Sequence, residues 1–340
     1  LITRYSQGEP DNGFEVTAMA YKANGNATNQ VAKRAIEGGV IGRFGSLSPS
    51  DSVNTSRYSL SSQWARKSEL KATRVNAYYV RSEFELNSNF TNFLDFPTAG
   101  DQIQQKEDRN TWGFNSSRSW FGNFNNREME NTVGFQTRYD NVNPISLSRT
   151  QGGVPMAKLD SNGNLQPSTV RRDILNEYNI SFYAENRMQW SPWFRSVIGV
   201  RNDFYHFDVD SNLEANSGKK SDNMTSPKLA FVFGPWSKTE FYLNGGGGFH
   251  SNDARGITKR VDPNAPTVAT RRATPLVRTW GYEVGFRTGI IPGLQTTVSI
   301  WQLHVDSELL FVGDAGSTVA SRPSLRRGIE FTNYWRPVSW

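Results

Sequence analysis

Few side chains in this sequence have the types that support catalysis or metal binding. The three histidines, His206, His250 and His304, are far apart and have no partner ligands at the spacing of a metal site. Cysteine is absent, which excludes thiol chemistry and cysteine-based zinc sites. Glu177 and Glu185 would share one face of a strand, but alternation alone explains that placement without a glycosidase acid pair. We therefore predict no bound metal, no cofactor and no enzymatic activity.

A polar segment follows one predicted strand, where the chain enters a long loop. Its side chains have hydrogen-bonding groups that suit contact with a ligand or with another part of the protein. The alternative role is a network of hydrogen bonds that holds the base of the loop. The binding candidates in this segment are His250, Asn252, Asp253 and Arg255.

A second candidate surface lies in an earlier long loop, where aromatic residues alternate with asparagine and aspartate. Such a mixture of apolar and polar groups is suited to capture of a small molecule, although packing of the loop on itself explains it equally well. The aromatic residues are Phe90, Phe93 and Phe96.

The elements that position these residues show a period of two. Between Asp173 and Trp190, even positions such as Ile180 and Phe182 are apolar, while odd positions such as Glu185 are polar. Strands of soluble sandwiches keep such alternation for about 5 or 6 residues. This stretch is long enough to cross a bilayer at a tilt. We therefore predict an all-β fold, a transmembrane antiparallel β-barrel.

The same pattern recurs along the chain and predicts about thirteen strands. In one of them the apolar face changes from even to odd positions, which predicts a β-bulge near Trp301. The predicted strands span residues 1–7, 13–24, 54–66, 71–86, 109–121, 128–150, 173–190, 193–209, 225–235, 239–250, 277–288, 294–309 and 323–337.

The polar face of these strands is expected to line the lumen, because charged side chains facing lipid would be strongly unfavourable. Most of these groups are expected to be solvated or paired rather than to contact a ligand. The predicted lumen-facing residues are Glu177, Glu185, Arg187, Arg201, Asp203, Glu240, Glu283, Arg287, Arg326 and Glu330.

Short and long connections alternate along the chain. The long ones span residues 25–53, 87–108, 151–172, 210–224, 251–276 and 310–322. Short turns at one rim and long loops at the other are typical of outer-membrane barrels. The short side is therefore predicted to be periplasmic and the long side extracellular.

Composition agrees with this interpretation and excludes others. The net charge of +6 arises from 38 basic and 32 acidic residues without a long run of one sign, so no nucleic acid partner is predicted. No apolar stretch approaches the roughly 18 residues of a membrane-spanning helix. Leu1–Pro10 lacks the features of an export signal, so we expect the start of the mature protein to lie outside this sequence.

Several segments resemble the TonB-dependent receptor family of the bacterial outer membrane. They are QVAKRAIEGGVIGRF (30–44), YAENR (183–187), SPKLAFVFGPW (226–236), FHSNDARG (249–256), DSELLFVGDAG (306–316) and RPSLRRGIE (322–330). The resemblance extends over nearly the whole chain, in the order of its strands and turns.

The resemblance implies a barrel of about 22 strands closed by an N-terminal plug. Residues 1–340 would then form part of that barrel, and the plug and the C-terminal strands would lie outside them. The implied partners are outer-membrane lipid, the plug, the TonB complex and a small nutrient such as a siderophore-type iron chelate. A diffusion porin without a plug and a soluble β-rich sugar-binding protein are the alternative classes. The sequence does not identify the ligand.

Overall fold

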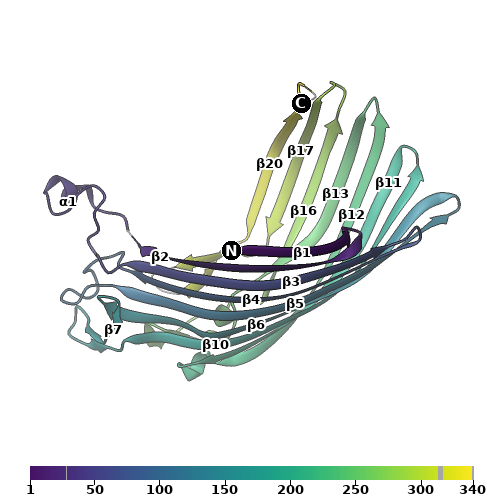
Figure 1. The fold of residues 1–340 in the computed structure, drawn as a ribbon. Coiled ribbons are helices and arrows are strands. Elements are labelled where there is room, and N and C mark those ends of the chain that lie inside the picture. Colours follow the sequence, from purple (N-terminus) through teal and green to yellow (C-terminus); the bar gives the residue numbers. More distant parts are fainter. Residues whose placement is uncertain (28, 313–316, 339–340) are drawn as a thin grey trace.

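The computed structural model describes residues 1–27, 29–312 and 317–338, and most of them form one antiparallel sheet (Figure 1). Its long strands are β1 (Ile2–Glu9), β2 (Asn12–Asn26), β3 (Ser52–Lys67), β4 (Lys71–Ser88), β5 (Ile103–Phe124), β6 (Arg127–Gln151), β10 (Thr169–Ser191), β11 (Phe194–Ser211), β12 (Gly218–Trp236), β13 (Thr239–Ser251), β16 (Leu276–Thr288), β17 (Leu294–Val305) and β20 (Ser324–Trp335). The predicted strands are confirmed.

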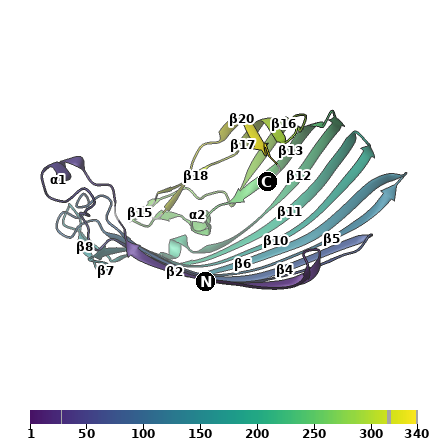
Figure 2. The same cartoon turned by 45° about the horizontal axis from the view of Figure 1, so that its top comes forward.

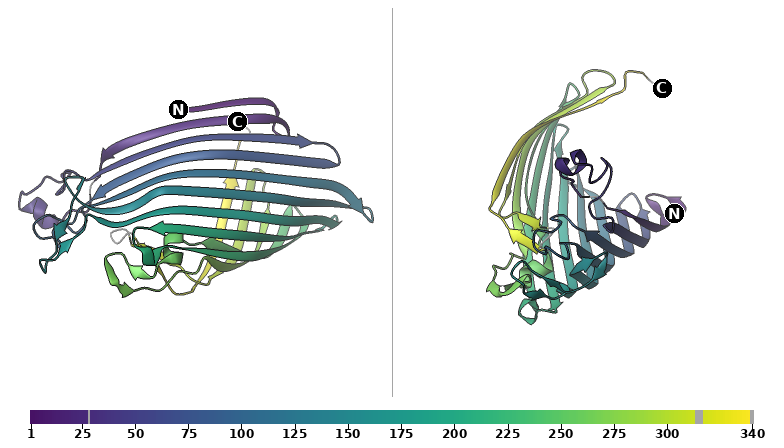
Figure 3. Two further views of the ribbon diagram at one scale, coloured as in Figure 1. Left: turned by 90° about the horizontal axis from the view of Figure 1, so that it is seen from below. Right: turned by 90° about the vertical axis from the view of Figure 1, so that its left-hand side faces the viewer.

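Each long strand pairs with the long strands before and after it in sequence, so the sheet is a simple meander. In the described residues β1 and β20 do not pair with each other, and the sheet remains an open, curved trough (Figure 3). Tight turns join the strands at one end, and the longer connections lie at the other (Figure 1). This asymmetry agrees with the layout predicted from the sequence.

The longer connections contain small elements. They are α1 (Lys33–Glu37), β7 (Val154–Pro155), β8 (Lys158–Leu159), β9 (Leu165–Gln166), the 3₁₀ helix η1 (Glu214–Asn216), α2 (Ala254–Thr258), β14 (Val261–Asp262), β15 (Ala265–Ala269), β18 (Leu309–Val312) and β19 (Ser317–Ala320). Figure 2 shows α2 on the concave side of the sheet. Among the described residues, no helix combines the length and the apolar character needed to cross a membrane.

The two faces of the sheet differ in chemistry. Apolar side chains such as Phe182, with 61% of its surface exposed, Val284 and Ile300 project from the convex face. The opposite face carries charged ladders, for example the neighbouring pair Glu240 and Arg287. An apolar outer belt of this size on a folded chain requires a nonaqueous surrounding or a partner.

Two strands begin earlier than the sequence predicted. β5 starts at Ile103 and β12 at Gly218, so the connection before β12 covers only residues 212–217 rather than 210–224. Most of the added residues are polar on both faces, as at Lys219 and Asp222, because these strand ends extend past the apolar belt. Backbone pairing with β11 continues there without any alternation to reveal it.

The predicted bulge near Trp301 is wrong. β17 keeps an unbroken register with both β16 and β20 through this position. The apolar residues that follow simply occupy the concave face: Val305 is buried there, and the Trp301 ring covers Gly328 of the next strand. The change of pattern marks inward packing of apolar groups and not an extra residue.

Tyrosine rings on the concave face lie over glycines of the adjacent strand. Tyr78 is paired with Gly113, and Tyr183 with Gly134. A β-carbon at either glycine would collide with the ring. Such contacts, in which an aromatic ring covers an adjacent glycine, help to fix the pairing of strands.

Candidate functional site

A polar cavity of about 350 Å³ lies on the concave face near the end of the sheet that bears the long loops. The floor of the cavity is formed by strands β5, β6, β10 and β11. We call residues 252–275 the α2 segment, and its first residues form one wall of the cavity. The lining residues are Glu107, Arg109, Arg138, Asp140, Val142, Ile145, Leu175, Glu177, Asn179, Tyr205, Ser251, Asn252, Asp253, Ala254 and Arg255.

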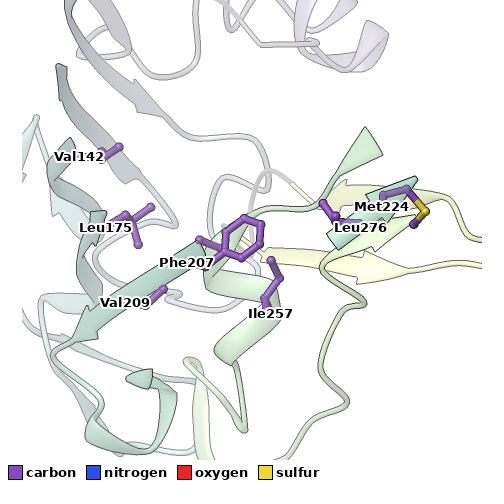
Figure 4. Close-up of a cluster of buried hydrophobic side chains, with 8 residues drawn as sticks. Val142, Leu175, Phe207, Val209, Met224, Ile257 and Leu276 are labelled. Carbon is purple, nitrogen blue, oxygen red and sulfur yellow. The ribbon is translucent and has the colours of Figure 1, made fainter. Parts of the chain in front are cut away.

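Apolar packing holds the α2 segment against the sheet. Phe207 is fully buried, with 0% of its surface exposed, and it faces Ile257 of α2 (Figure 4). Burying such side chains stabilises the contact by roughly 1.5–3 kcal/mol each. The complete cluster consists of Val142, Leu175, Phe207, Val209, Met224, Ala254, Ile257 and Leu276.

Hydrogen bonds fix the first turn of the α2 segment. The Asp253 carboxylate accepts from the backbone N–H of Arg255 at 2.9 Å and from its guanidinium at 2.6 Å. Burial disfavours the charged carboxylate, but the Arg255 charge outweighs this effect and lowers the pKa of Asp253. Asn252 donates to the carbonyl oxygen of Thr274 across the base of the loop. The loop-base network that the sequence offered as an alternative is therefore present.

A second set of ion pairs forms the floor of the cavity. Asp140 accepts from Thr111 at 2.6 Å and from the guanidinium groups of Arg138 and Arg109 at 2.6 and 3.3 Å. Arg109 also donates to Glu107 at 2.7 Å. These groups are therefore fixed in orientation and largely neutralised. Any ligand bound at this floor would meet charges that are fixed in position rather than flexible side chains.

The structure brings together part of the predicted binding set. Asn252, Asp253 and Arg255 line the cavity with Glu177, whereas His250 does not. The sequence did not identify Glu107, Arg109 or Tyr205 as candidates. For Glu107 the reason is that β5 was predicted to start only at residue 109. The available signal was the pair of opposite charges at Glu107 and Arg109, two residues apart, which a strand places on one face.

The three phenylalanines of the second candidate surface differ in burial. Phe96 is buried, and the charged ends of Arg149 and Lys158 each lie 5.4 Å from its ring centre. Phe90 and Phe93 remain exposed, Phe93 at 59%. Phe96 is thus part of the packing inside the loops, while Phe90 and Phe93 keep a surface that a ligand can reach.

Three buried polar residues join the loops of the first half of the chain. We call Asp51, Gln102 and Lys158 the polar hub. Asp51 accepts from Gln102 at 2.9 Å and from Ser48 at 2.7 Å. Lys158 donates to the carbonyl oxygens of Gln102, at 3.1 Å, and Gly100. Burial lowers the pKa of Lys158 to about 8.

The remaining predicted lumen residues share the concave face of the sheet, mostly in ion pairs. Glu185 accepts from Arg187 at 2.8 Å and from Lys228 at 3.4 Å. Glu240 contacts Arg195 and Arg287. The others are Arg201 with Asp203, Glu283 with Tyr242 and Asn244, Arg326 with Glu308, and the exposed Glu330. That this face lines a closed lumen remains a prediction, since the sheet is open.

The described residues contain no group of three or more histidine, aspartate or glutamate side chains arranged to hold a metal ion. The polar cavity is the candidate site considered below, because it brings several of the predicted binding residues together.

The chain matches one known protein family over nearly its whole length. A family model described as "TonB dependent receptor-like, beta-barrel" matches residues 2–340. The chain belongs to the TonB-dependent receptor family. The resemblance noted in the sequence is thereby confirmed, and the receptor class is favoured over a diffusion porin or a soluble sugar-binding protein. No curated protein sequence matches this receptor chain.

Solved structures of similar fold come from the same family. The unliganded ferric citrate transporter FecA has a TM-score of 0.71 at 11% identity, over 98% of this chain and 47% of that one. The ferric yersiniabactin uptake receptor FyuA from Yersinia pestis has a TM-score of 0.65 at 13% identity, over 96% of this chain and 46% of that one. The copper transporter OprC has a TM-score of 0.67 at 14% identity, over 99% of this chain and 50% of that one. The receptor chain thus spans about half the length of these structures.

Proposed function

We propose that this chain forms wall and extracellular loops of an outer-membrane receptor that captures a scarce nutrient and imports it with energy supplied through TonB. The observation that carries the proposal is the family match over residues 2–340. The polar cavity beside the α2 segment supports it, because capture requires fixed polar groups at the loop end of the sheet.

The proposal includes partners beyond these residues. Residues 1–340 are part of one barrel of about 22 strands. The convex apolar belt contacts outer-membrane lipid, and the concave face contacts a plug domain that in turn binds TonB. The titles of the similar structures name ferric citrate, ferric yersiniabactin and copper. A siderophore-type chelate therefore leads the list of nutrients to test.

Growth of a deletion strain on a panel of iron, copper and carbon sources tests this function. We expect loss of growth on one source when the full-length gene is deleted, restoration by the same gene, and no restoration in a strain without TonB. Equal growth of deletion and parent strains on every source would contradict the proposal.

Shortening of the loop from Ser251 to Arg272 in the full-length receptor separates capture from assembly. We expect uptake to be lost while heat-modifiable gel migration remains normal, because loops contribute little to the strand ladder. Normal uptake by the shortened receptor would show that the α2 segment has no role in capture.

A further inference from the structure

Among the residues that the structure describes, the cavity beside the α2 segment contains one carboxyl group that no hydrogen bond or ion pair holds. Four carboxylates and three guanidinium groups line it. Asp140, Glu107 and Asp253 are all hydrogen-bonded to arginines. Glu177 is half-buried between them, and within the described ranges no hydrogen bond or ion pair reaches its carboxylate.

A second residue of the same cavity has a hydrogen-bond acceptor without a donor. Asn252 is 4% exposed, and its Nδ2 is occupied by the bond to Thr274. Its Oδ1 is buried and has no hydrogen-bond partner among the residues described. Buried polar atoms are nearly always hydrogen-bonded in folded proteins, so an orphaned acceptor in a cavity wall indicates a missing donor.

The two unsatisfied groups have the same chemical requirement. Both accept hydrogen bonds, and Glu177 in addition bears a negative charge when its carboxyl group is ionised. Ammonium and guanidinium groups offer several donors, no acceptor and a positive charge. Val142 and Leu175 line the same cavity, and their apolar surface suits the aliphatic stem that carries such a group.

We propose that this cavity is a subsite for an ammonium or guanidinium group of the imported ligand, with Glu177 as its counter-charge and Asn252 as a second acceptor. This inference rests on the proposed function. A volume of about 350 Å³ lies at the low end for ligand pockets, so the cavity accommodates one end group and not an entire chelate. The remainder of the ligand would extend toward the loops.

Saturation-transfer NMR on the full-length receptor in detergent tests the subsite without knowledge of the ligand. The probe is methylguanidinium chloride, and N-methylurea serves as its uncharged analogue at equal ionic strength. We expect saturable binding of methylguanidinium and much weaker binding of N-methylurea. Loss of a charged hydrogen bond in Glu177→Gln should raise the Kd of methylguanidinium about 10- to 100-fold.

Two further variants make the result specific. Glu177→Asp keeps the charge and should retain part of the affinity. Glu128→Gln makes the same change at an exposed position at the turn end of β6 and should bind as the parent does. Heat-modifiable migration shows that each variant is folded.

Equal binding of the charged and uncharged probes, or equal binding by the parent and Glu177→Gln, would overturn the subsite. So would absence of methylguanidinium binding together with a lower melting temperature of Glu177→Gln, since a cation of the protein itself would then fill the cavity. These outcomes are independent of the growth assay. Failure of the proposed function would appear as unchanged growth, whatever the probe does.

Discussion

The two groups of long loops differ in the interaction that contributes most to their attachment. The loops of the first half are joined through the polar hub, where buried hydrogen bonds connect segments far apart in sequence. The α2 segment in the second half folds inward and is held by an apolar cluster around Phe207. Hydrogen bonds fix relative positions through direction, whereas apolar packing supplies most of the free energy of attachment. The first group is therefore a fixed frame, and the α2 segment is a docked wall.

The largest expected effect comes from Phe207→Ala, which removes the centre of the apolar cluster. We expect the free energy of docking of the α2 segment to fall by about 3–5 kcal/mol, because a fully buried ring is lost. Hydrogen exchange across residues 252–275 measures the change. Phe204→Ala, on the exposed face of the same strand, should leave that exchange unaltered. Unchanged protection in Phe207→Ala would show that hydrogen bonds, and not packing, hold the segment.

The wall between the loop groups and the turns supplies the next comparison. Phe182→Arg should destabilise the barrel by about 2–4 kcal/mol, as expected for arginine facing lipid near the middle of the membrane. Glu185→Arg, on the opposite face, should change the free energy of unfolding by only about 1 kcal/mol. Denaturant unfolding in lipid measures both. Greater damage from Glu185→Arg would reverse the assignment of the two faces.

In the polar hub, Asp51→Asn should loosen the frame while leaving the α2 segment docked. The new amide nitrogen faces hydrogen-bond donors, including Gln102, so we expect a loss of about 1.5–3 kcal/mol in local stability. Faster hydrogen exchange in residues 89–102 would report it. Asp160→Asn is the control, because the hydrogen bonds of Asp160 stay within its own exposed hairpin. Equal loosening by both changes would argue against a hub.

The smallest effect concerns pH and should appear only in the first group of loops. The pKa of Lys158 is about 8 in the closed frame and returns to about 10.4 when the loops open. Between these values the open state binds more protons, so raising the pH stabilises closure by up to about 1.4 kcal/mol per unit. Below pH 8 the full cost of the buried ammonium is present. Hydrogen exchange of the first group of loops, measured against pH in the parent and in Lys158→Met, should show this stabilisation in the parent only. An identical pH dependence in the two proteins would refute it.

The sequence predicted the strands well because each crosses an environment with two different sides. Phe182 and Glu185 report those sides directly, and the register follows from them. The same argument explains the shortfall at Lys219 and Asp222. Both faces carry polar residues there, so pairing with β11 produces no alternation in the sequence.

The site was predicted less completely because it depends on contacts between distant segments. Asn252, Asp253 and Arg255 were recognised from their polarity, but nothing local placed Glu177 beside them. A usable signal was present in Phe207 and Val209, which are apolar residues on a face that is otherwise charged. Such exceptions near the loop end indicate that a loop covers the wall. The burial of Phe96 similarly involves Lys158, which is distant in sequence.

The tyrosine rings over Gly113 and Gly134 have a consequence for assembly. If the convex face contacts lipid as proposed, a strand displaced by one position would expose charged side chains to lipid, which is strongly unfavourable. Displacement by two positions preserves every inward and outward side chain, so the bilayer cannot detect the error. It would place Tyr78 against Thr111 or Asn115, where a side chain occupies the space that the ring requires. Steric fit between neighbouring strands can thus disfavour the register errors that the pattern of polar and apolar residues does not disfavour.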